Sequence, residues 1–88
     1  MKLNGTFILR QVADEILAIP VGETALRFHG MVLLNGVSRV IWEQLTEQTD
    51  LQTIVDAVTE QFEVPEEQAR EDILEFLHGL KTANLLEE

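Results

Sequence analysis

The chain of 88 residues holds few side chains that could carry out a reaction. Ser38 is its only serine, His29 and His78 are its only histidines, and it has no cysteine and no tyrosine. A Ser-His-Asp arrangement would have to use Ser38, yet Ser38 does not lie in the strained G-x-S-x-G turn that exposes a nucleophile. We therefore expect no catalytic residue, and no enzyme acting alone.

Metal and cofactor sites are equally poorly supported. The two histidines are far apart in the sequence, and neither has a second histidine at the spacing of a zinc motif. The acidic residues near position 70 repeat at helical spacing, which is typical of a solvated helix face; they are Glu67, Glu71, Asp72 and Glu75. No glycine-rich phosphate-binding motif occurs. We expect neither a metal nor a cofactor.

Charge narrows the possible partners. The net charge is −10, and it is concentrated in residues 43–88, which hold thirteen acidic and two basic side chains. Such a surface repels nucleic-acid phosphates and anionic lipid. No apolar run approaches the roughly 20 residues of a membrane span, and the N-terminus lacks the apolar segment of a signal peptide. We expect one domain in the cytoplasm, with no nucleic-acid or membrane partner.

The first third of the chain predicts short strands. Residues 6–12 and 15–21 are rich in aliphatic and β-branched side chains and are separated by Ala13 and Asp14, which favours a hairpin. Pro20 suits the end of the second strand, where a missing N–H is tolerated. Residues 31–34 form a third apolar run, and residues 22–30, bounded by glycines, are expected to be a connection.

From Asn35 onward the apolar residues recur with helical spacing. Asn35 is expected to cap a helix over 36–47, and Thr49 with Gln52 has the spacing of a capping box for the next helix. Pro65 opens the third helix. The expected core residues are Trp42, Ile54, Phe62, Ile73, Phe76, Leu77 and Leu80, closed by Leu85 and Leu86. The predicted fold is α+β and winged-helix-like, with three short N-terminal antiparallel strands followed by three helices.

The order of these elements resembles the PqqD family over nearly the whole chain. The residues that carry the resemblance are Leu34-Asn35, Ile41-Trp42, Ile54-Val55, Phe76-Leu77 and Leu80. This family comprises coenzyme PQQ synthesis protein D and related domains, the RiPP recognition elements.

The resemblance implies a noncatalytic domain, spanning residues 1–88, that binds the leader segment of a ribosomally made precursor peptide. It also implies delivery of that precursor to a modifying enzyme, such as a radical SAM maturase or a leader peptidase or cyclase. The leader would add as an extra strand beside the third strand, in a groove walled by the third helix.

The expected peptide-binding residues of the strand are Met31, Val32, Leu33 and Leu34, with apolar leader side chains fitting between Met31 or Leu33 and the helix. Advancing about 100° per residue places two edges beside the buried stripe of the third helix. One edge carries Arg70, Leu74, Leu77 and Lys81, and the other carries Asp72, Phe76, Gly79 and Ala83. We expect the first edge to face the leader, because its two basic residues could hold a leader carboxylate. Alternatively, Leu74 covers a loop or Leu85.

Two other functions fit the same fold class. A winged-helix DNA-binding regulator would have this order of elements, but a helix that begins with acidic residues would meet phosphates with like charge. A structural or regulatory subunit of another enzyme is the second alternative. Titration of a candidate leader and of a DNA duplex would separate these possibilities.

Overall fold

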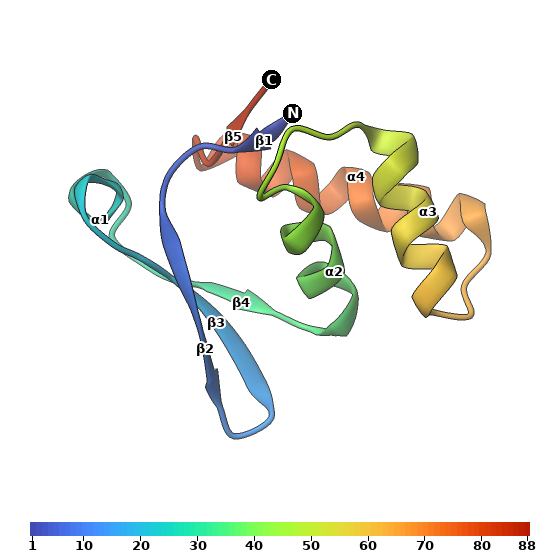
Figure 1. The fold of residues 1–88 in the computed structure, drawn as a ribbon, viewed down its shortest axis with the longest axis horizontal. Helices are drawn as coiled ribbons and strands as arrows, with labels where there is room; N and C mark the ends of the chain where they lie inside the picture. Colours follow the sequence, from blue (N-terminus) through green and yellow to red (C-terminus); the bar gives the residue numbers. More distant parts are fainter.

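The N-terminal half of the computed structural model, which describes residues 1–88, is built on a three-stranded antiparallel sheet (Figure 1). Its strands are β2 (Phe7–Val12), β3 (Glu15–Pro20) and β4 (Val32–Leu34), in the order β2-β3-β4. The β2–β3 turn places Ala13 in the left-handed region, with a φ of 56°. The three predicted strands are therefore confirmed, each within two residues of its predicted ends.

Three further elements lie outside the prediction. The connection contains a five-residue helix, α1 (Glu23–Arg27), and the chain ends pair as β1 (Lys2–Leu3) with β5 (Leu86–Glu87). The Arg27 guanidinium donates hydrogen bonds to the carbonyl oxygens of Asn4 and Asn84. Arg27 thereby ties α1 to both ends of the chain.

The three predicted helices are present as α2 (Gly36–Gln44), α3 (Leu51–Gln61) and α4 (Glu66–Thr82). Their apolar stripes meet the inner face of the sheet in one core, which Leu85 completes from the C-terminal side. Leu86, at the start of β5, is half-buried against this core. The α+β, winged-helix-like prediction is confirmed. None of these helices combines the length and the apolar character that crossing a membrane requires.

Trp42 lies at one end of a chain of aromatic contacts. Its side chain is 2% exposed, and its ring meets that of Phe7 edge-on, with centroids 5.0 Å apart. Phe7 in turn meets Phe28 at 6.5 Å. Phe62 and Phe76, which were also predicted as core residues, are only half-buried.

The predicted cap of α2 is correct and that of α3 is not. Asn35 Oδ1 accepts from the Ser38 backbone N–H at 2.8 Å, while Ser38 Oγ accepts from the Asn35 backbone N–H at 2.8 Å. For α3, however, Asp50 rather than Thr49 is the cap, and its carboxylate accepts from the Thr53 N–H at 2.8 Å. Aspartate is the stronger capping residue of the two.

This cap should make stability depend on pH at acid values. The backbone N–H and then the hydroxyl of Thr53 hold the pKa of Asp50 below its ordinary value of 3.8. A carboxyl group whose pKa is lower in the folded state stabilises the fold above its unfolded pKa, and this contribution is lost as the pH falls through the folded pKa. Asparagine caps a helix equally well but does not titrate in this range. We expect urea denaturation to show wild type losing stability relative to Asp50→Asn only below pH 3.8; a constant difference at all pH values would contradict this assignment.

Candidate functional site

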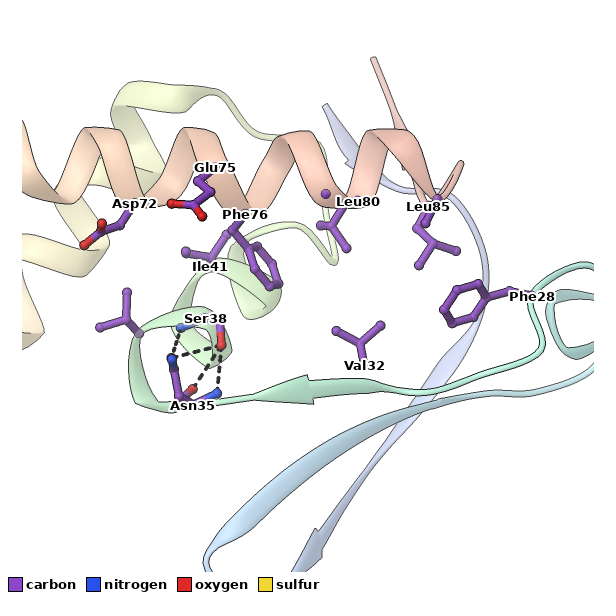
Figure 2. A pocket seen from close by; sticks show the side chains of 13 residues that line it. Phe28, Val32, Asn35, Ser38, Ile41, Asp72, Glu75, Phe76, Leu80 and Leu85 are labelled. Atoms are coloured by element: carbon purple, nitrogen blue, oxygen red, sulfur yellow. Dashed lines mark hydrogen bonds between the residues drawn. The ribbon is translucent and has the colours of Figure 1, made fainter.

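A cavity of about 550 Å³ opens between β4 and α4 (Figure 2). We call this feature the β4–α4 groove. Eight of its thirteen lining residues are hydrophobic. The lining residues are Phe28, Val32, Asn35, Val37, Ser38, Ile41, Asp72, Glu75, Phe76, Gly79, Leu80, Ala83 and Leu85. A concave, mostly apolar site with a few polar groups has the general form of a ligand-binding site.

One side of the groove is an unpaired strand. β4 is the last strand of its sheet and pairs only with β3, through the register Ala18 to Val32 and Ile16 to Leu34. Because side chains alternate along a strand, Val32 lines the groove while Leu33 points to the outer face of the sheet and is 56% exposed. The free edge of β4 therefore offers backbone N–H and C=O groups to an additional strand.

The opposite side is one edge of α4. Phe76 is half-buried there, between the exposed carboxylates of Asp72 and Glu75 on one side and Gly79 on the other. A Cβ atom added at Gly79 would have no atom within 4 Å apart from its chain neighbours and the backbone of its own helix. Glycine inside a helix costs about 1 kcal/mol relative to alanine. At this position the absence of a side chain keeps the groove open.

The serine and one of the two histidines, the residues that could act as nucleophile or base, are already engaged within the fold. Ser38 Oγ lies 3.0 Å from Asn35 Oδ1 and serves the cap of α2. His29 Nε2 lies 3.0 Å from the Leu26 carbonyl oxygen, and neither histidine lines the groove. No group of three or more histidine or carboxylate side chains is arranged to hold a metal ion. The groove has the features of a binding surface and shows no catalytic arrangement.

Of the four strand residues expected at the site, only Val32 lines the groove. Leu34 is buried in the core, and Met31 and Leu33 are exposed away from it. The structure therefore brings Val32 to the groove and leaves Met31 and Leu33 outside its lining.

The four expected residues of the helix lie on the edge of α4 that does not border the groove. Arg70 donates from Nη2 to Gln52 Oε1 of α3 at 2.8 Å, and Lys81 Nζ lies 3.1 Å from Glu88 Oε1. Leu77 is buried in the core, while Leu74 is 48% exposed. The structure places the cavity at the other edge, with Asp72, Phe76, Gly79 and Ala83.

Helical spacing had already grouped Asp72, Phe76, Gly79 and Ala83 on one edge of the helix. Phe28 and Leu85 could not be found in this way, because they reach the groove from the α1–β4 connection and from the C-terminus. Figure 2 shows both side chains at the end of the groove away from Asp72.

Fold and groove together define a class of protein: a small winged-helix-like domain with an open strand edge beside an apolar helix wall. Residues 22–86 match the family model of coenzyme PQQ synthesis protein D (PqqD). This chain belongs to the PqqD family. A comparison with curated proteins gives no match.

Among solved structures, the chain is similar to one described as TbiB1 in complex with the TbiA(beta) leader peptide. The TM-score is 0.74 at 25% sequence identity, and the match covers 99% of this chain and 95% of that one. The likeness therefore extends over the whole domain, including β1 and β5.

Proposed function

We propose that this protein is a noncatalytic domain that binds the leader segment of a ribosomally made precursor peptide and delivers that peptide to a modifying enzyme. The observation that carries the proposal is the free edge of β4 beside an apolar cavity walled by α4. A solved structure of similar fold holds a leader peptide, and this likeness supports the same mode of binding here.

Tight binding requires both the strand edge of β4 and the apolar cavity. Ordering an extended peptide costs about 2–5 kcal/mol, and backbone hydrogen bonds contribute only about 1 kcal/mol each after exchange with water. Apolar burial returns roughly 25 cal/mol per Å², so one large side chain seated against Phe76 and Leu80 offsets much of the ordering cost. Strand addition would provide alignment, and the cavity would provide affinity and selectivity.

Addition of a bound leader should perturb backbone amides along β4 and along the groove edge of α4. We expect the largest NMR shift changes at Val32–Leu34 and near Phe76 and Gly79, because these segments border the groove. Short peptides encoded beside this gene are the natural candidates for the titration. The internal control is α3, which contributes no residue to the groove; changes confined to Leu51–Gln61 would overturn the assignment.

The same titration distinguishes the two alternative functions. The first turn of α4 carries Glu66 and Glu67, and Lys81 is paired with Glu88, so a DNA duplex should bind no more tightly at low salt than a neutral polymer. A purely structural subunit of another enzyme would bind neither leader nor duplex.

The modifying enzyme is the second proposed partner, and a radical SAM maturase or a leader peptidase or cyclase would suit the role. Such a partner should process its precursor faster with this domain present. A groove variant that no longer binds the leader should lose this effect while the enzyme itself remains active.

A further inference from the structure

We propose that the β4–α4 groove selects a leader segment carrying a Lys or Arg four positions before a large apolar residue. This inference rests on the proposed function and specifies the chemistry of its peptide. The basic side chain would meet Asp72 and Glu75, and the apolar side chain would lie between Gly79 and Ala83.

The two carboxylates form one end of the groove. Asp72 and Glu75 are three residues apart and therefore adjacent on the helix surface, and both are exposed into the cavity mouth. Asp72 Oδ1 accepts a hydrogen bond from Gln68 Nε2 at 2.9 Å, and neither carboxylate has a cation of this chain within 4.0 Å. A ligand with a positive charge at this end is complementary, whereas an acidic one is repelled.

The other end is apolar and has unfilled space. Phe28, Leu80 and Leu85 line this end (Figure 2). Gly79 also lines the groove, and it leaves room where any other residue would project a side chain. Alanine would fit at this position and would make the helix more stable than glycine does. Packing within the free protein therefore does not explain the glycine. A side chain of the ligand filling that space accounts for the glycine.

The four-residue spacing in the leader follows from the rise per residue of α4 and of an extended peptide. The Asp72–Glu75 pair and the Gly79–Ala83 pair are centred about 7.5 residues apart along α4, or roughly 11 Å at the helical rise. An extended peptide covers that length in three to four residues. Only even spacings place both side chains on the same face of a strand, and four residues, about 13 Å, fits better than two, about 7 Å.

The order of the basic and apolar residues in the leader follows from the direction of β4. This strand runs from the Phe28 end of the groove toward Asn35, which lies at the carboxylate end (Figure 2). β2, β3 and β4 are all antiparallel neighbours, and antiparallel pairing is the more stable kind per residue. A leader antiparallel to β4 enters at the carboxylate end, so its basic residue precedes its apolar one.

The first test selects peptides from a displayed random library on the immobilised full chain. We expect the enriched peptides to share Lys or Arg four positions before Phe, Leu, Ile or Met. The variant Asp72→Asn/Glu75→Gln should enrich the apolar residue without the basic one. The matched control Glu67→Gln/Glu71→Gln removes the same charge from residues that do not line the groove, and should keep both preferences.

Two outcomes overturn the inference in different ways. If wild type enriches apolar residues without basic ones, and the selected peptides depend on Phe76, the charge pattern is wrong while peptide binding in the groove stands. If no peptide is enriched, or if selection is unaffected by Phe76→Ala, the groove is not the binding site and the proposed function fails with the inference.

The second test measures a selected peptide by fluorescence polarisation. Changing its basic residue to Glu should weaken binding to wild type roughly tenfold at low salt, and by less than about twofold for Asp72→Asn/Glu75→Gln. Gly79→Leu should weaken the peptide that carries the large apolar residue more than the same peptide with Ala at that position, because the new side chain fills the same space. Equal losses for both peptides would show that the apolar residue does not lie beside Gly79.

Discussion

Replacement of Trp42 by alanine is expected to lower the free energy of unfolding by about 3–5 kcal/mol, the usual cost of truncating a large aromatic residue in a core. The side chain is 2% exposed and supports Phe7 through their edge-on contact at 5.0 Å. A domain of this size has about 5–15 kcal/mol of stability at most, so the variant should melt at a much lower temperature. Urea denaturation with fluorescence or circular dichroism would measure the change.

Trp42→Phe is the matched control, since it keeps an aromatic ring and most of the buried apolar area. It should cost much less than alanine. Trp42 does not line the groove, so any loss of leader affinity in Trp42→Ala should follow the unfolded fraction and vanish in conditions that restore folding. Full stability combined with lost peptide binding would contradict a structural role for this residue.

The largest effect on binding is expected for Phe76→Ala. Phe76 is half-buried and lies in the middle of the groove wall, so a bound leader would bury much of the remaining ring. Losing that burial should weaken binding by about 1.5–2.5 kcal/mol, or roughly 10- to 70-fold. Isothermal titration with the leader would measure the change, after a check that the variant remains folded at the working temperature.

Leu74→Ala provides the comparison on the same helix. Leu74 is 48% exposed on the edge of α4 that does not border the cavity, so its truncation should leave affinity unchanged within about twofold. The reverse result, with Leu74→Ala weakening binding and Phe76→Ala leaving it intact, would return the binding site to the edge that carries Arg70 and Lys81.

The sequence predicted the two edges of α4 but not which of them borders the groove. Helical spacing separated them correctly, because the angle between residues on one helix is a local property. The preference for the basic edge depended on Arg70 and Lys81 being free to meet a ligand. Arg70 is engaged by Gln52 on α3, and Lys81 pairs with Glu88, which lies beyond the end of α4. The spacing of residues along one helix does not reveal such partners.

The orientation of β4 shows the same limit. Four consecutive apolar residues do not indicate which alternate pair faces the core, because an unbroken apolar run has no period of two. Pairing with β3 decided it, by placing Val32 beside buried Ala18 and leaving Leu33 on the outer face.

The sequence by itself determined the three strands of the main sheet, the three long helices, the Asn35 cap and the burial of Trp42. These features depend on spacing and capping within a few residues, where the backbone geometry of strand and helix is invariant. Only the tertiary structure decided the β1–β5 pair, the clamp made by Arg27 and the edge of α4 that borders the groove. Each of these joins segments far apart in the chain, so it depends on how the helices pack against the sheet, which no local spacing specifies.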